Sequence, residues 1–188
     1  MLIVPNIIAG LWIAFEIWLV ARDRREGRGK TEKDRGTVCY IFLSVILGVT
    51  AAGFINGYLP TGFAENKLIS LLVVGALLML GGLALRIWSV TVLGASFRTT
   101  VETHQDQELV DRGPYHLARH PSYGGLFLLC GGYAVCLQNW LSLIVALVVP
   151  LPAILYRIQV EEQLLVPQLG PAYQNYRLRT KRLIPWIW

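Results

Sequence analysis

Charge is scarce in this chain of 188 residues: Asp, Glu, Lys and Arg make up 15% of it, against about 25% in an average soluble domain. Hydrophobic residues reach 54%, and the mean hydropathy is +0.50. These values exclude an ordinary soluble globular domain, a disordered chain and a collagen-like chain. The alternating segments of about ten residues that a membrane β-barrel requires are missing as well.

Cysteine is scarce too. Cys39, Cys130 and Cys136 lie in or beside apolar runs, with no CxxC pair and no Cys/His spacing typical of metal ligands. We therefore predict neither a metal site nor a disulfide framework, and we expect the cysteines to pack as small apolar side chains. The formal net charge of +5 is typical of basic cytoplasmic loops in a membrane protein, so nucleic acid is not the expected partner.

The apolar residues gather in runs of up to about 20 residues or more, long enough to cross a ~30 Å hydrocarbon layer as helix. The sequence therefore predicts an all-α, polytopic membrane helical bundle of about five transmembrane helices. A tight turn at Gln138-Asn139 and a kink at Pro150 and Pro152 are expected, followed by a charged, amphipathic tail from Arg157. The five runs cover Leu2–Val20, Val38–Tyr58, Leu68–Leu93, Tyr123–Leu137 and Trp140–Tyr156.

The distribution of positive charge predicts the orientation. The first run has no basic residues before it and seven Lys or Arg between Arg22 and Arg35 after it, which is opposite to a cleavable signal peptide. With the N-terminus outside, Lys67 is the only one of 17 Lys and Arg residues that falls outside. The positive-inside rule therefore favours an outer N-terminus and a cytoplasmic tail.

Polar residues concentrate in two stretches, 109–125 and 157–176, which this topology brings to the cytoplasmic mouth of the fourth and fifth spans. Because proline lacks an N–H and biases the preceding residue away from the α region, we expect backbone groups around His120-Pro121 to be free for a ligand. Gly124 and Gly125 allow either close approach of a ligand or a small-residue packing face between helices.

Arg157 and Glu161 lie four residues apart and so share a helix face. Either an interfacial ion pair with a snorkelling arginine or a functional site at the membrane edge explains them. Glu162 points about a quarter-turn away and is expected to be solvated. Glu16 either faces the bundle or, as we expect, snorkels from the first span. His104 and His116 are expected at the surface.

At this point the motifs match a known family. The chain between 94 and 185 resembles the isoprenylcysteine carboxyl methyltransferases, a family of integral-membrane methyltransferases with phospholipid methyltransferase relatives. The resemblance is carried by Leu109-Val110, Gly113, Tyr115, Arg119-His120-Pro121-Ser122-Tyr123, Gly125, Glu161-Glu162, Gly170, Tyr173 and Tyr176.

The resemblance implies that S-adenosyl-L-methionine binds to a helical membrane fold without a Rossmann domain, and no GxGxxG follows a predicted strand here. The length suits a single domain, 1–188, with three N-terminal spans in 1–93, and the resemblance places the cofactor-binding and catalytic half in 94–188. It gives catalytic roles to Arg157 and Glu161, with Arg157 facing the substrate. Residues 107–108 are Gln-Glu where the family more usually has a His-Thr-like pair. The family's cofactor contacts fall on Thr100, Gln107, Glu108, Leu109, Val110, Tyr115, His120, Pro121, Ser122, Tyr123 and Glu161.

The expected function is thus methylation of a carboxylate or other head group on a prenyl-like or lipid acceptor, at a cytoplasmic cofactor site. O-, N- and S-methylation all stay open. One alternative is an NADPH-dependent, sterol-reductase-like enzyme, which shares a His-Pro-x-Tyr pattern but is typically about twice as long. The other is a non-enzymatic membrane scaffold, which would not need polar residues to converge on one mouth.

Overall fold

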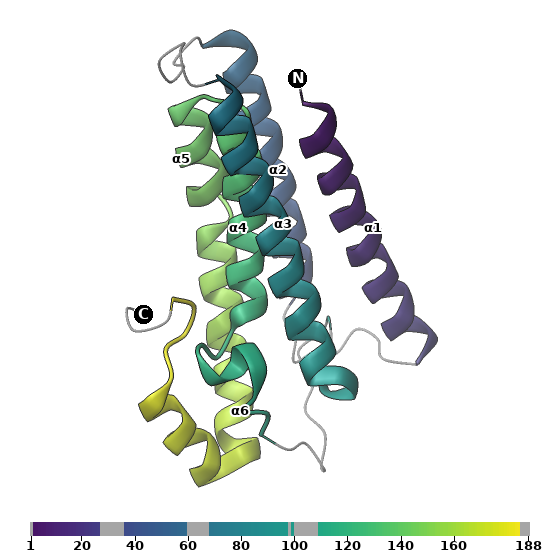
Figure 1. Ribbon diagram of the computed structural model, residues 1–188. Coiled ribbons are helices and arrows are strands. Elements are labelled where there is room, and N and C mark those ends of the chain that lie inside the picture. The colour runs from purple at the N-terminus through teal and green to yellow at the C-terminus, as the bar shows by residue number, and fades with distance from the viewer. Residues whose placement is uncertain (1, 27–35, 60–67, 98, 100–108, 185–188) are drawn as a thin grey trace.

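The computed structural model describes residues 2–26, 36–59, 68–97, 99 and 109–184, and the regular elements within these ranges are helices (Figure 1). The predicted all-α fold is therefore confirmed. The helices are α1 (Ile3–Arg25), α2 (Thr37–Tyr58), α3 (Leu68–Leu93), α4 (Pro121–Cys136), α5 (Trp140–Val148) and α6 (Leu151–Arg179), with two short 3-10 turns, η3 (Gly94–Ser96) and η4 (Gly113–His116).

Four stretches of helix in the described chain are long and apolar enough to cross a membrane: Ile3–Arg25, Thr37–Tyr58, Ile69–Leu93 and Trp140–Arg179. α4 has only 16 residues, and it packs at the centre of the bundle against α1, α2, α3 and α5. With α4 included, about five helices form the bundle, and the chain is a multi-pass membrane protein.

Glycine pairs bring α3 and α4 into close contact. A β-carbon on Gly82 would lie 2.6 Å from the carbonyl oxygen of Gly125, and one on Gly132 would lie 2.6 Å from that of Gly75. The two glycines on each helix are seven residues, or about two turns, apart, so they share one face. Close backbone approach at small residues is a main source of helix association in membranes. Of the two readings left open for Gly125, the packing face is the one the structure shows.

The turn between α4 and α5 forms as predicted. Gln138 adopts a positive φ of 61°, and the Asn139 side chain caps α5 by accepting from the backbone N–H of Leu141 at 3.0 Å and Ser142 at 3.1 Å. The Asn139 amide also donates to the carbonyl of Leu59 at the end of α2. The turn therefore fixes the antiparallel pair and its place beside α2.

The fifth apolar run contains the predicted kink. α5 ends at Val148 and α6 begins at Leu151, while Val149 and Pro150 between them keep right-handed helical backbone angles, so the two helices form one bent stretch. α6 then continues through the expected tail to Arg179, interrupted by Gly170 at φ 55° and ψ −135°. That interruption turns the last part of the helix away from the axis of α6, so the chain returns toward the bundle (Figure 1).

The returning segment pairs with the loop before α4. The N–H of Arg119 donates to the carbonyl of Lys181 at 2.8 Å, and the N–H of His120 donates to that of Arg182 at 2.9 Å. The carbonyl of His120 accepts from the N–H of Tyr123 at 3.1 Å. The expectation of free backbone groups at His120 is therefore wrong, because the C-terminal segment takes the N–H that the missing helix ladder leaves.

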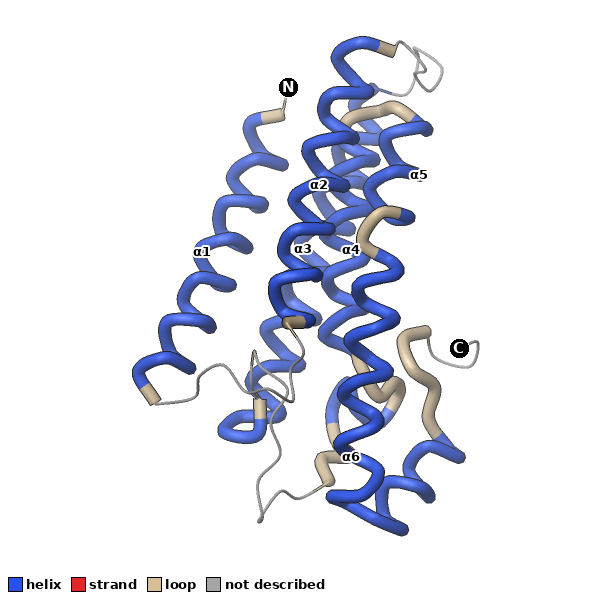
Figure 2. Tube along the Cα trace, turned by 180° about the vertical axis from the view of Figure 1, so that it is seen from behind, coloured by secondary structure: helices blue, strands red, loops and turns tan. Residues whose placement is uncertain are grey.

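α1 lies apart from α2, although the two are consecutive in the chain (Figures 1 and 2). It packs mainly on α3, through a cluster in which Ile8 contacts residues of α3 and α4. Near its C-terminal end Asp23 accepts from both the N–H and the hydroxyl of Thr99, each at 2.7 Å. α1 is therefore held at this end and on its α3 side, and its α2 side faces a cavity.

Candidate active site

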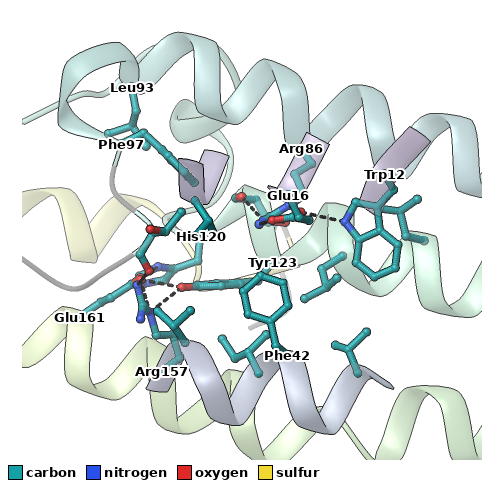
Figure 3. A pocket seen from close by; sticks show the side chains of 18 of the residues that line it. Trp12, Glu16, Phe42, Arg86, Leu93, Phe97, His120, Tyr123, Arg157 and Glu161 are labelled. Carbon is teal, nitrogen blue, oxygen red and sulfur yellow. Dashed lines mark hydrogen bonds and ion pairs between the residues drawn. The ribbon is translucent and has the colours of Figure 1, made fainter. Parts of the chain in front are cut away.

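A cavity of about 1160 Å³ runs along the inside of the bundle. It extends from Asn6 and Tyr133 at one end to Glu161 and Tyr173 at the other. Side chains of α1 and α2 form opposite parts of its apolar wall, and α3, α4 and α6 complete it. Its polar end coincides with the segment before α4 and the middle of α6 (Figure 3).

Three side chains from α4 and α6 form a hydrogen-bonded triangle at the polar end (Figure 3). The Tyr123 hydroxyl donates to Glu161 Oε1 at 2.5 Å, and Arg157 Nε lies 2.8 Å from the same oxygen and 3.0 Å from the hydroxyl. The predicted sharing of a helix face by Arg157 and Glu161 is confirmed, and they form an ion pair. The triangle leaves the Glu161 side chain 21% exposed in the cavity wall.

The Arg157 guanidinium is occupied by protein groups on every side that the structure describes. Besides Glu161 and Tyr123, it donates through Nη1 to the hydroxyl of Thr37 and through Nη2 to the carbonyl of Thr99, both at 2.8 Å. Its side chain is only 3% exposed. Arg157 thus joins α2, the segment after α3, α4 and α6 at one point.

His120 lies between two consecutive carboxylates of α6. Its Nδ1 is 3.1 Å from Glu161 Oε2, and its Nε2 is 3.6 Å from Glu162 Oε1. Burial alone would lower the pKa of His120, but the hydrogen bond to Glu161 and the negative charges of Glu161 and Glu162 outweigh it and raise the pKa above its ordinary value. The imidazole therefore favours the charged form, which balances one of the two carboxylates.

Tyr115 lies in the η4 turn and also faces the cavity. Burial, followed by the negative charge of Glu161, raises the pKa of Tyr115 well above its ordinary value. Its hydroxyl is therefore neutral at physiological pH and keeps a proton to donate. The Tyr176 hydroxyl fixes this turn by donating to the carbonyl of Tyr115 at 2.5 Å.

The expectation that Glu162 is solvated is wrong. It is a buried residue, and its carboxylate accepts from Arg119 Nε at 2.9 Å and Arg182 Nη2 at 3.1 Å. The quarter-turn offset from Glu161 points it toward the returning C-terminal segment rather than water. Sequence periodicity could not show this, because the partners arrive through the chain reversal at Gly170.

Glu16 does not snorkel as expected, and the bundle-facing alternative is the one the structure shows. Glu16 is buried and forms an ion pair with Arg86 of α3, whose Nη2 lies 2.7 Å from Glu16 Oε2. Both residues line the cavity (Figure 3). Arg86 was not among the predicted site residues. A single arginine within an apolar run of 26 residues could have identified it, because ionisable residues inside membrane spans mark functional sites.

The structure brings most of the predicted cofactor residues to this cavity. Pro121 is buried in the first turn of α4 and does not line the cavity, and Thr100, Gln107, Glu108 and His104 lie outside the described residues. His116 is exposed as expected, while Cys130 and Cys136 are buried and Cys39 is exposed. The described part of the chain has no cluster of His, Cys, Asp or Glu suited to a metal ion. The predicted residues that line the cavity are Leu109, Val110, Tyr115, His120, Ser122, Tyr123, Arg157 and Glu161.

Comparison with known proteins gives relatives of one kind. The protein-S-isoprenylcysteine O-methyltransferase of Saccharomyces cerevisiae is 34% identical over 117 residues, which cover 61% of this chain and 49% of the relative. The corresponding B enzyme of Arabidopsis thaliana is 30% identical over 149 residues, covering 78% of this chain and 72% of the relative. The chain spans about half the length of the yeast relative and 54% of the Dictyostelium discoideum one.

A solved structure and a family model agree with these relatives. The structure of a eukaryotic intramembrane Ras methyltransferase, an isoprenylcysteine carboxyl methyltransferase, matches with a TM-score of 0.64 and 25% identity, over 78% of this chain and 52% of that one. The phospholipid methyltransferase family model matches residues 70–172. This range holds His120, the Arg157–Glu161 pair and the glycine seam between α3 and α4, which consists of Gly75, Gly82, Gly125 and Gly132. The resemblance read from the motifs is confirmed, and the chain belongs to the phospholipid methyltransferase family.

Proposed function

We propose that this protein is an S-adenosyl-L-methionine-dependent methyltransferase that acts on a lipid or prenylated acceptor. The observation that carries the proposal is the position of Glu161, a carboxylate in the cavity wall that Tyr123, Arg157 and His120 all orient. The α-amino group of the donor is a cation, and a fixed carboxylate in a largely apolar cavity is a strong partner for it. Glu161 therefore serves as the donor's amine contact in this proposal.

The Tyr173 hydroxyl is a second feature of the polar end of the cavity that suits such a donor. The buried Tyr173 hydroxyl has no hydrogen-bond partner among the described residues, and Tyr173 lines the cavity beside Glu161. A buried polar atom without a partner costs free energy unless a ligand or water satisfies it. A ligand that carries both charged and hydrogen-bonding groups would satisfy this hydroxyl, so the residues present fit the proposed donor.

S-adenosylmethionine, when bound, supplies a methyl group that its sulfonium already activates. The protein then has to align the acceptor, exclude water and balance charge. A carboxylate acceptor is ionised at pH 7 and needs no general base, in keeping with a site whose buried histidine favours the charged form. Tyr123 and Tyr115 form apolar walls around the polar end and limit water there.

The rest of the cavity suits an apolar acceptor chain. Between α1 and α2 it is lined by side chains such as Ile13, Val45 and Ile46, and these two helices do not pack closely on each other. An amphiphile can therefore enter sideways from the bilayer while its head group reaches Glu161. The relatives are named for isoprenylcysteine, so a prenyl chain with a terminal carboxylate is the proposed acceptor class.

Arg157 has a more specific place in this proposal than the sequence indicated. The resemblance implies that it faces the acceptor, but its guanidinium is held by Glu161, Tyr123, Thr37 and Thr99. We propose that it orients Glu161 and Tyr123, and that an acceptor carboxylate reaches it by replacing the carbonyl of Thr99. The donor contacts come from 94–188, and the first 93 residues supply the α1, α2 and α3 walls, with the polar end on the cytoplasmic side.

Methyl transfer in nanodiscs tests the proposal. We expect radiolabelled methyl groups from S-adenosylmethionine to appear in a farnesylcysteine analogue with a free carboxylate. The same analogue with its carboxylate converted to an amide should accept none. Phosphatidylethanolamine is the matched alternative, and methylation of that lipid alone would contradict the proposed acceptor class while retaining the reaction type.

A further inference from the structure

A buried ion pair connects α1 to α3 inside the cavity, away from the Glu161 triangle. Arg86 donates to Glu16 through Nε and, at 2.7 Å, through Nη2. The indole N–H of Trp12, one turn earlier on α1, donates to Glu16 Oε1 at 2.8 Å. The side chains of Arg86 and Glu16 are 12% and 7% exposed, so both charges lie out of water.

The third nitrogen of the same guanidinium reaches the start of α4. Arg86 Nη1 donates to the Ser122 hydroxyl at 2.7 Å. Ser122 immediately precedes Tyr123, whose hydroxyl holds Glu161. One side chain therefore contacts both the wall of the acceptor cavity and the turn that carries the Glu161 triangle (Figure 3).

Stability alone is a poor explanation for this pair. The free energy needed to remove two charges from water can exceed the attraction between them. Apolar residues of similar volume therefore often replace a buried ion pair with no loss of stability. Ionisable residues within a membrane bundle are rare and mark functional sites by default. At this depth the α2 side of α1 faces the cavity, so among the described helices α1 is attached mainly through its α3 and α4 side, where Trp12 packs on the core.

We propose that Arg86 is a positioning residue that couples the placement of α1 to the geometry of the Ser122–Tyr123 turn. This inference rests on the proposed function and deepens it. When an apolar acceptor chain occupies the cavity between α1 and α2, the Glu16–Arg86 pair keeps α1 in register with α3. The same guanidinium holds Ser122. The position of α1, which lines the acceptor cavity, is therefore fixed relative to the Ser122–Tyr123 turn, which orients Glu161.

The central test replaces the pair by apolar residues, Glu16→Leu with Arg86→Met. We expect the double variant to fold with an unchanged or higher thermal midpoint. Its acceptor KM should rise and its kcat should fall, together on the order of 100-fold in kcat/KM, because small misplacement of reacting groups costs that much. Affinity for S-adenosylhomocysteine should stay within about threefold, since Arg157 still holds Glu161. A stable double variant with wild-type kinetics would overturn the proposal.

Two single variants separate positioning from simple packing. Ser122→Ala keeps the Glu16–Arg86 ion pair but removes the hydroxyl through which Arg86 holds the Ser122–Tyr123 turn. We therefore expect kcat to fall while the acceptor KM is unchanged. Ser89→Ala is the matched control, because Ser89 is a buried polar residue of α3 whose hydroxyl, within the described chain, donates to the carbonyl of Leu85 on its own helix. It should leave both constants unchanged, and equal effects of the two variants would contradict a specific role for the turn.

A distance measurement tests the coupling without any reaction. Spin labels at the exposed positions Leu11 of α1 and Leu128 of α4, in a background without the native cysteines, should give a narrow distance distribution in the wild-type protein. Glu16→Gln keeps the shape of the side chain but leaves the buried Arg86 charge without its partner, so it and the double variant should both broaden the distribution. An unchanged distribution would refute the coupling, whereas a wild-type protein that fails to transfer methyl groups would refute only the proposed function.

Discussion

The Tyr123 hydroxyl donates to Glu161 Oε1 at 2.5 Å, and this bond joins the first turn of α4 to the middle of α6. The two residues are 38 positions apart and approach because the α4–α5 turn reverses the chain, and α6 continues from α5 back toward the start of α4. Arg157 and His120 hold the other sides of the same carboxylate. The proposed donor contact is therefore fixed by both polar stretches that the sequence singled out.

Replacement of Arg157 by lysine tests the division of roles at this carboxylate. Lys keeps the charge but loses the planar fork that contacts Glu161, Tyr123 and Thr99 at once. We expect Arg157→Lys to raise the acceptor KM and to weaken donor binding as well, by about tenfold each, since one hydrogen bond to a charged group is worth about 1.5–3 kcal/mol. The measurement is a two-substrate kinetic matrix, and loss of acceptor affinity alone would assign Arg157 to the acceptor.

The glycine seam predicts a sharp contrast between neighbouring positions. Gly82→Ala places a methyl group 2.6 Å from the carbonyl of Gly125, whereas Gly81→Ala meets nothing within 4 Å. We expect Gly82→Ala to lower stability by about 1–3 kcal/mol, as overpacking does. Gly81→Ala should leave it unchanged or raise it slightly through better helix propensity. Thermal unfolding in detergent checks both, and equal midpoints would contradict the packing of α3 on α4.

His120 predicts a pH dependence of stability with a defined sign. Its pKa is raised above the ordinary 6.5, so its contribution is fully present below that pH and is lost as the pH rises through the folded-state pKa. The thermal midpoint of the wild-type protein should therefore fall over that interval, and His120→Asn should lack this component. His116→Asn, at an exposed histidine, is the control and should keep the wild-type slope.

The charge distribution predicts the orientation in the membrane. In a Cys39→Ser background, cysteines at the exposed positions Glu26 and Leu178 should react with an impermeant reagent only from the cytoplasmic side. A cysteine at Tyr58, exposed at the other end of α2, should react from outside. Labelling of position 178 in intact cells would contradict the predicted orientation.

The ends of a helix could be predicted from the sequence where the helix stops at the same residue as its apolar run. α3 covers the predicted run 68–93, but α1 extends beyond Val20 to Arg25, because backbone hydrogen bonding continues in water after the apolar residues stop. In the fifth run the kink at Pro150 and Pro152 was predictable, because proline breaks the helical hydrogen-bond ladder. The continuation of α6 to Arg179 was not, because its later residues are too polar to extend the apolar run.

Site residues were predictable where partners are local and not where they are distant. The Arg157–Glu161 pair follows from helical periodicity. Glu16 and Arg86 are 70 positions apart, and the partners of Glu162 arrive only through the chain reversal at Gly170, so no local pattern announces either contact. Glu16, Arg86 and Glu162 are charged residues that are buried only because distant parts of the chain pack around them.

Calorimetric titration with S-adenosylhomocysteine tests the central claim most directly. The wild-type protein in nanodiscs should bind it with one site per chain, and Glu161→Gln should weaken binding by roughly 10- to 150-fold, the equivalent of one hydrogen bond to a charged ligand. Gln163→Ala, two residues along α6 at an exposed position, should bind as the wild type does. Binding of NADPH in place of S-adenosylhomocysteine, or equal affinity of Glu161→Gln and the wild type, would contradict the account.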